Sequence, residues 1–222
     1  MSRAILIYGQ SGVGKTTSLK TLDPKKTLII DADRKGLSWR GWRNQYSKEK
    51  KNYAKTSEVA DIENLLDKVN ANKDLAYIEN VVIDGLSTIM VDDEVKRMKD
   101  KGFDKWTDLA QCIWGLVTKA SLLRDDLNII FIGHVQTDSD ENSNTFSKVK
   151  SSGRKLDKFV LESKFTTVLF AKHIKGETDE YIFETQSNNS TAKSPLGCFK
   201  SSTIPNDMQF VIDSLKKYET EE

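Results

Sequence analysis

The sequence predicts an α/β fold with a mainly parallel central sheet, and three observations support this prediction. Short apolar runs recur along the chain, and each ends in or is followed by a glycine or a polar residue, as buried parallel strands often are. Segments with helical periodicity lie between these runs, which is typical of a parallel sheet. The length of 222 residues suits one domain with a sizeable core. We therefore expect a single domain over residues 1–222.

Composition excludes several classes of protein. The chain has 34 basic and 33 acidic residues and a net charge of +1, so any nucleic-acid site must be local. Cys112 and Cys198 lie far apart without a partner motif, which predicts reduced thiols. No signal peptide or membrane-spanning run is recognisable, so we expect a cytoplasmic protein with no membrane partner. Residues 219–222 predict a solvated acidic tail.

The first predicted strand, residues 4–8, leads into a glycine-rich loop. Residues 9–16 fit the pattern G-x-x-x-x-G-K-[ST], and residues 15–22 predict the helix that follows. Glycines let backbone N–H groups converge on phosphate oxygens, Lys15 reaches the β- and γ-phosphates, and the Thr16 hydroxyl binds Mg²⁺. This predicts a triphosphate site made of Gly9, Gln10, Ser11, Gly12, Val13, Gly14, Lys15, Thr16 and Thr17.

Two further buried strands, residues 27–31 and 80–84, end in aspartates. The carboxyl ends of parallel strands face the ligand crevice. Asp84, at the end of Asn-Val-Val-Ile-Asp, fits the Walker B pattern and is predicted to hold Mg²⁺ together with Thr16. Asp33 is a candidate for orienting or deprotonating the attacking water, although Asp31 or Asp33 is equally able to cap a turn.

A fourth buried strand is predicted at residues 128–135. His134 stands at its carboxyl end, where a polar side chain can contact a γ-phosphate and report its loss. Residues 137–157 have no apolar periodicity and predict a mobile loop that follows this sensor. The second half of the loop contains four cations that are candidates for DNA contact: Lys148, Lys150, Arg154 and Lys155.

Residues 34–55 are basic and aromatic, with eight cations, two tryptophans and two tyrosines. Cations for phosphates and flat rings for bases are the components of a single-strand binding surface, with Arg40 and Arg43 as candidates. The alternative is a solvated loop in which Trp39 and Trp42 cover the core, and the residues alone leave both interpretations open.

The remaining segments predict scaffold elements. Residues 57–73 predict an amphipathic helix, and residues 89–124 predict two helices. Strands at residues 165–173 and 180–186 predict an antiparallel extension of the sheet near its C-terminal side. A second polar loop is expected at 187–203, and a closing helix at 207–218.

Taken together, these motifs resemble the RecA-like ATPases, and more narrowly the short phage-encoded nucleotide-binding ATPases of single-strand annealing and recombination. The resemblance covers nearly the whole chain and is most specific in the phosphate loop and at Asp84. Asp33 matches the place of the family's catalytic glutamate. His134 matches the glutamine that couples nucleotide to DNA in RecA. Lys193 resembles a basic residue that acts across a subunit boundary.

The resemblance implies a three-layer fold and an Mg²⁺-dependent ATPase with catalytic residues Lys15, Asp33, Asp84 and His134. It also implies self-association into a ring or filament with ATP between subunits, single-stranded DNA as partner, and a single-strand-binding protein as a further partner. If phage-encoded, the protein would work in the cytoplasm of the host bacterium.

Two other functions fit the phosphate loop. One is a P-loop kinase that phosphorylates a nucleotide or another small metabolite, which is disfavoured because no compact arginine-rich lid is recognisable. The other is a GTPase, which is disfavoured because the base-selective N-K-x-D motif is absent; its near miss at residues 72–74 ends an amphipathic helix.

Overall fold

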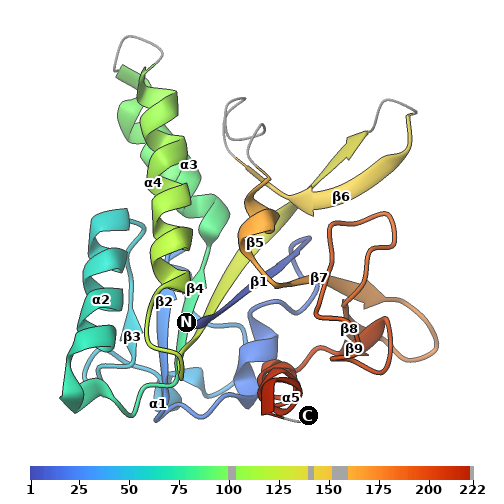
Figure 1. Cartoon of the computed structure of the whole chain (residues 1–222), viewed down its shortest axis with the longest axis horizontal. Helices are drawn as coiled ribbons and strands as arrows, with labels where there is room; N and C mark the ends of the chain where they lie inside the picture. The colour runs from blue at the N-terminus through green and yellow to red at the C-terminus, as the bar shows by residue number, and fades with distance from the viewer. Residues whose placement is uncertain (100–103, 140–142, 152–159, 221–222) are drawn as a thin grey trace.

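A computed structural model of the chain describes residues 1–99, 104–139, 143–151 and 160–220. In these residues, nine strands form one sheet in the order β3-β2-β4-β5-β1-β7-β8-β9, with β6 paired to β5 off this path (Figure 1). The strands are β1 (Arg3–Gly9), β2 (Thr27–Asp31), β3 (Tyr53–Ala54), β4 (Asn80–Asp84), β5 (Asn128–Ser139), β6 (Thr145–Val149), β7 (Thr167–Ile174), β8 (Glu180–Glu184) and β9 (Thr203–Pro205).

The sheet is parallel from β3 to β7 and antiparallel at β8 and β9. Strand β5 lies between β1, which leads into the phosphate loop, and β4, which ends in Asp84. The carboxyl ends of β1, β2, β4 and β5 therefore open at one edge, which is where a doubly wound sheet binds its ligand.

Helices cover both faces of the sheet and give three layers (Figure 1). Side chains alternate along each strand, so Leu6 and Tyr8 face one core while Ile5 and Ile7 face the other. The first core is closed by α2 (Val59–Ala71), α3 (Leu86–Lys96) and α4 (Asp104–Ser121). The second is closed by α5 (Met208–Thr220), by residues around the 3₁₀-helix η1 (Thr17–Thr21) and by side chains near α1 (Trp42–Gln45).

The predicted parallel strands and amphipathic helices are confirmed to within about three residues, except that β5 runs four residues beyond its predicted end. The antiparallel extension is confirmed from β8 onward. One detail is wrong, because β7 pairs with β1 in parallel and the extension therefore starts one strand later than expected. The predicted α/β fold, with a mainly parallel central sheet and an antiparallel extension, is thus the fold of this chain.

The expected loop at residues 137–157 is wrong in its described part. Strand β5 continues to Ser139 and forms an antiparallel hairpin with β6, in which Gln136 is opposite Lys148. The hairpin projects from the sheet (Figure 1). Most of its residues are half-buried or exposed, so the segment shows no apolar alternation.

The expected polar loop at 187–203 is confirmed up to residue 202. The expected acidic tail is wrong for residues 219 and 220, whereas residues 221–222 lie outside the described residues. Residues Ser190 and Lys193 make single bridges to β6 and β7, and β9 begins at Thr203. Glu219 belongs to α5 and its carboxylate lies 2.5 Å from the Arg3 guanidinium. No helix among the described residues combines the length and the apolar character needed to cross a membrane.

Candidate functional site

The phosphate loop forms an open cradle of backbone N–H groups at the end of β1. Gly12 and Gly14 have φ angles of 83° and 86°, a left-handed conformation that glycine adopts without strain. Gly9 has no room for a side chain, since a Cβ there would lie 2.6 Å from the Ala171 carbonyl oxygen. Within the described part of the chain, the N–H groups of Gly14, Lys15 and Thr16 donate no hydrogen bond. Unpaired donors of this kind fit phosphate oxygens.

The predicted helix at residues 15–22 is only a short 3₁₀-helix, η1. Side-chain hydroxyls compete for the carbonyl groups that an α-helix would use: Ser18 Oγ donates to the Lys15 carbonyl at 2.6 Å, and Thr21 Oγ1 donates to the Ser18 carbonyl at 3.2 Å. The helix dipole is correspondingly short, and the local N–H groups and Lys15 supply most of the positive charge of the cradle.

Lys15 is buried beneath the loop. Its Nζ donates to the carbonyl oxygens of Gly9 and Gln10 at 2.9 and 2.6 Å. Burial lowers the pKa of the Lys15 ammonium to about 8, because the desolvation outweighs the nearby Asp84 carboxylate. An ammonium held only by carbonyl dipoles gains a full counter-charge when a phosphate enters, so this arrangement fits an anionic ligand.

Asp84 and Thr16 form the oxygen pair predicted to hold a metal ion. Thr16 Oγ1 donates to Asp84 Oδ2 at 2.6 Å, and Asp84 is 3% exposed. Burial raises the pKa of Asp84 to about 6. No cluster of three or more metal-binding side chains occurs among the described residues. A two-residue oxygen site nevertheless fits Mg²⁺, which usually takes one or two protein ligands and completes its shell with water and phosphate oxygens.

Asp33 is clamped beside this pair by two donors. Thr88 Oγ1 donates to one carboxylate oxygen, and Lys35 forms an ion pair with the other. Burial opposes ionisation, but the hydrogen bonds from Lys35 and Thr88 lower the pKa of Asp33. Gly85 has a φ of 116°, and a Cβ there would lie 2.6 Å from Asp33 Oδ1. The strand exit after Asp84 therefore needs glycine to make room for Asp33.

His134 completes the group of strand-end residues. It lines a cavity of about 350 Å³ together with Lys15, Thr16, Asp33 and Asp84. Burial and the nearby Lys15 lower the pKa of His134, so its imidazole is neutral at pH 7. A second cavity of about 150 Å³, lined by His134, Ser87 and Lys150, adjoins it.

The structure therefore places the four predicted catalytic residues around one cavity, although their chemical roles stay predictions. It also adds Lys35 and Thr88, which the sequence analysis did not assign to the site. Lys35 was grouped with the basic stretch, but its position two residues after Asp33 at a strand exit was an available signal. Of the predicted loop residues, Gly9, Gln10 and Val13 do not line the cavity themselves.

None of the predicted DNA-contacting or trans-acting cations that the structure describes lines this cavity, although Lys150 lines the adjoining one together with His134. Arg40, Arg43 and Lys150 are exposed, and Lys148 pairs with Asp138 at 2.7 Å across the hairpin. Lys193 is held by its backbone, which bonds to Val168. Arg154 and Lys155 lie outside the described residues, as does Asp157 at the end of the expected loop.

Within residues 34–55, the structure decides the role of Trp39. Trp39 is 7% exposed, packs in the second core and donates from its indole nitrogen to Gln45 at 2.8 Å, so it is a core residue. Asp31 is also structural, because its buried carboxylate accepts from the Tyr53 hydroxyl at 2.5 Å and from the Gly36 N–H at 2.8 Å.

Comparisons with known proteins agree with this geometry. A family model described as an AAA domain matches residues 1–196. A search of curated protein sequences finds no significant match. Among solved structures, the chain is similar to the flagellar accessory protein FlaH from Methanocaldococcus jannaschii, with 13% identity, a TM-score of 0.46, and coverage of 91% of this chain and 83% of that one. With the phosphate loop and its strand-end residues in place, the family match over residues 1–196 shows that the chain belongs to this AAA-domain family of P-loop, ATP-binding proteins.

Proposed function

We propose that the protein is an Mg²⁺-dependent ATPase that acts on single-stranded DNA as an oligomer, as in the recombination proteins that phages encode. The observation that carries the ATPase part is the convergence of Lys15, Thr16, Asp33 and Asp84 on one cavity. Bound Mg²⁺ would neutralise charge on the phosphates. The backbone cradle and Lys15 bind and orient the triphosphate, and Asp84 with Thr16 would hold the metal ion.

Asp33 suits the role of positioning the attacking water. Its carboxylate is ionised and fixed by Thr88 and Lys35, so it presents a hydrogen-bond acceptor without rearrangement. The neutral His134 is suited to accept or donate one hydrogen bond at the γ-phosphate. Catalysis would then rest mainly on positioning and charge neutralisation.

The link to DNA is supported by the contacts between His134 and the hairpin. The Lys150 N–H donates to the His134 carbonyl at 2.7 Å, and the His134 N–H donates to Ser87 Oγ at 3.0 Å. A displacement of His134 on γ-phosphate loss would therefore pull on the end of β6, which carries Lys148 and is followed directly by Lys150.

The decisive experiment measures ATP turnover with and without a thymidine oligonucleotide. We expect turnover to need Mg²⁺ and to rise with the oligonucleotide, and sedimentation to show ATP-dependent assembly. Lys15→Ala should abolish turnover, whereas Lys20→Ala, an exposed lysine in the same segment, should not.

Turnover that ignores DNA but needs a small phosphate acceptor would favour the kinase alternative. Normal ATP turnover in Lys15→Ala would contradict the assignment of this cavity as the nucleotide site. Asp84 and His134 would then need another explanation.

A further inference from the structure

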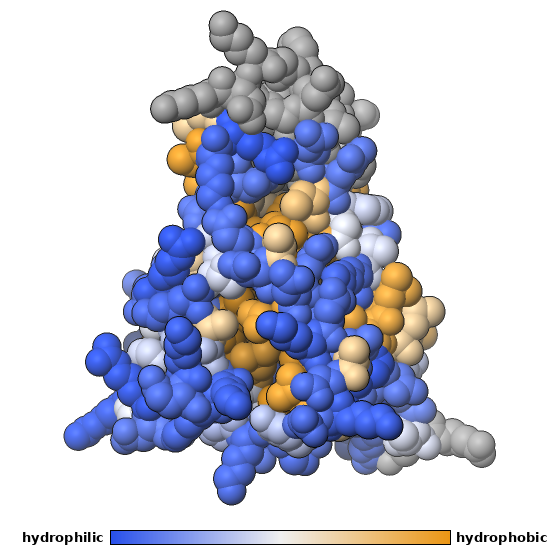
Figure 2. Space-filling model, turned by 90° about the vertical axis from the view of Figure 1, so that its left-hand side faces the viewer, coloured by the Kyte–Doolittle hydropathy of each residue, from blue (hydrophilic) through white to orange (hydrophobic). Residues whose placement is uncertain are grey.

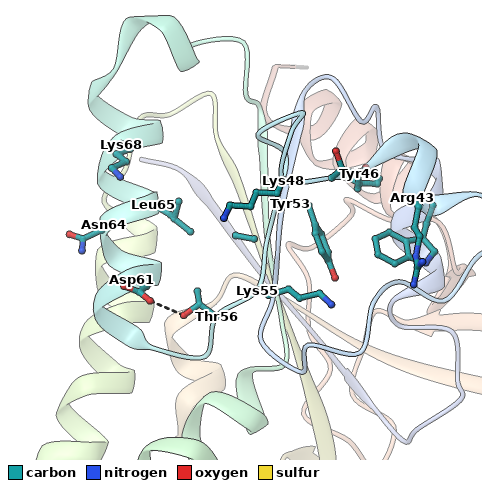
Figure 3. A pocket seen from close by; sticks show the side chains of 13 residues that line it. Arg43, Tyr46, Lys48, Tyr53, Lys55, Thr56, Asp61, Asn64, Leu65 and Lys68 are labelled. Carbon is teal, nitrogen blue, oxygen red and sulfur yellow. Dashed lines mark hydrogen bonds between the residues drawn. The ribbon is translucent and has the colours of Figure 1, made fainter.

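A third cavity lies at the free edge of the sheet, away from the nucleotide cavity. We call it the edge groove. Its volume is about 720 Å³, twice that of the nucleotide cavity. Strand β3 lies between α2 on one side and α1 with its following turn on the other (Figure 3). Figure 2 looks onto the α2 side of the molecule, where apolar side chains gather in a hollow bordered by hydrophilic ones.

An edge strand lines this groove. Strand β3 is the last strand of the sheet, so one side of its backbone has no neighbouring strand. On α2, Asp61, Leu65 and Lys68 line the groove at the spacing of one helix face. The helix rises about 10 Å between Asp61 and Lys68, which matches about three residues of extended chain. A groove between an edge strand and a helix is suited to receive an added strand.

The border of the groove is positively charged. It carries four cations, Arg43, Lys48, Lys55 and Lys68, and the single acid Asp61. None of these cations forms an ion pair with any described residue, whereas Lys96 and Lys119 nearby are paired with Glu58 and Asp67. Asp61 accepts a hydrogen bond from Thr56 Oγ1 at 3.0 Å. The electrostatic complement of this border is an acidic ligand.

The floor of the groove favours an apolar side chain over a stacked base. Tyr46 and Tyr53 are 1% and 8% exposed. The Trp42 ring lies 5.3 Å from the Tyr53 ring, and the Arg43 guanidinium lies 5.5 Å from the Trp42 centroid. Base stacking needs a ring face that is open to solvent, and these faces are largely covered. Leu65 and Lys48 instead point toward one another across the gap (Figure 3).

We propose that the edge groove binds an extended acidic segment of a partner protein. The segment adds a strand to β3, places a bulky apolar side chain between Tyr53 and Leu65, and sets its carboxylates against Lys48, Lys55 and Lys68. This site is separate from the nucleotide cavity and does not depend on the proposed DNA-coupled activity.

The test uses the full chain and fluorescein-labelled octapeptides in which one Phe, Trp, Leu or Ile stands among Glu residues. We expect saturable binding of at least one peptide with a Kd below about 1 mM, weakening as salt rises. Lys48→Glu with Lys68→Glu should weaken binding by more than about tenfold. Lys20→Glu with Lys73→Glu makes the same charge change at two exposed positions outside the groove and should leave binding unchanged. Thermal unfolding of each variant checks that the fold is intact.

Strand addition makes a further prediction about the peptide. Two peptides are compared, one N-methylated at the odd-numbered backbone amides and the other at the even-numbered ones. One should lose binding and the other should keep it, because only alternate residues of an added strand direct their N–H groups toward β3. Tolerance in both registers would overturn the added strand. Absence of binding by every peptide, or binding that the double variant leaves intact, would overturn the proposal. A different result would reassign the groove to nucleic acid: a thymidine oligonucleotide displaces the peptide, and the double variant also weakens binding of that oligonucleotide.

Discussion

Asp84 shows how a functional residue can oppose folding. Its carboxylate is buried, and the hydrogen bond from Thr16 only partly compensates, so the pKa rises from 3.8 to about 6. Between these two values the folded protein binds more protons than the unfolded chain. Stability therefore falls as the pH rises through this window, and the full penalty is present above pH 6. A cation bound at Asp84 would relieve it.

We expect Asp84→Asn to stabilise the protein while removing its metal-dependent activity. The amide oxygen can still accept from Thr16, and the loss of the buried charge should raise the free energy of unfolding by up to about 3 kcal/mol at pH 7.5. The gain should vanish below pH 4. Urea unfolding between pH 4 and 8 measures it, with the exposed Asp74→Asn as control. If Asp84→Asn were less stable than the original protein at pH 7.5, the buried, ionised Asp84 carboxylate would not be destabilising.

Tyr53 links the edge strand to the buried end of β2. Its hydroxyl is one of two donors to the Asp31 carboxylate, which is 1% exposed. Tyr53→Phe should lower the free energy of unfolding by about 1.5–3 kcal/mol, because a buried carboxylate loses a donor. Chemical denaturation measures the change, and Tyr77→Phe, at an exposed tyrosine, should be neutral. A neutral Tyr53→Phe would mean that water replaces the hydroxyl.

At the scale of elements, the turn from β4 into α3 sets the spacing between Asp84, the proposed metal ligand, and Asp33, the proposed water-positioning residue. Gly85→Ala forces a Cβ against Asp33 Oδ1 at a φ of 116°. We expect a loss of about 1–3 kcal/mol of stability from the strained backbone, and a loss of ATP turnover because Asp33 must move. Gly115→Ala, in an exposed turn of α4 with nothing within 4 Å, should instead gain about 0.5–1 kcal/mol.

Equal effects of the two alanines would contradict this interpretation of Gly85. The comparison is informative because both substitutions add the same methyl group. Only the backbone conformation and the neighbouring Asp33 differ.

At the scale of the whole molecule, ligand binding should raise the free energy of unfolding. A ligand at a hundred times its Kd adds about 2.7 kcal/mol, which raises the melting temperature by about 5–10 °C in a chain of this size. We expect ATP with Mg²⁺ to produce this shift and Lys15→Ala to abolish it, measured by thermal unfolding. Lys20→Ala is the matched control. A shift that survives in Lys15→Ala would place the nucleotide elsewhere.

Much of the scaffold could be predicted because its signals are local. The runs at β1, β2, β4 and β5 are apolar over successive residues, and the polar ends of the last three follow from the same stretch of chain. The phosphate loop is likewise a contiguous pattern, so its residues were identifiable before any packing was known.

Other features depend on which distant segments meet. The β5–β6 hairpin has polar side chains on both faces, and η1 is shortened by hydroxyls that reach carbonyls one turn away. Asp33 is fixed in the site by Thr88, which comes from another element. Whether Trp39 faces the core or solvent was undecidable from composition, since the same aromatic ring serves either purpose.

The sequence by itself determined that a phosphate-binding loop follows one buried strand and that acidic residues end two others, because each signal lies within a few consecutive residues. Only the tertiary structure decided that these strand ends surround one cavity and that α2 and β3 leave a basic groove open at the free edge of the sheet. The physical reason is that the order of strands and the packing of helices bring together side chains that are far apart in the chain. Their positions in the sequence do not indicate that they are in contact.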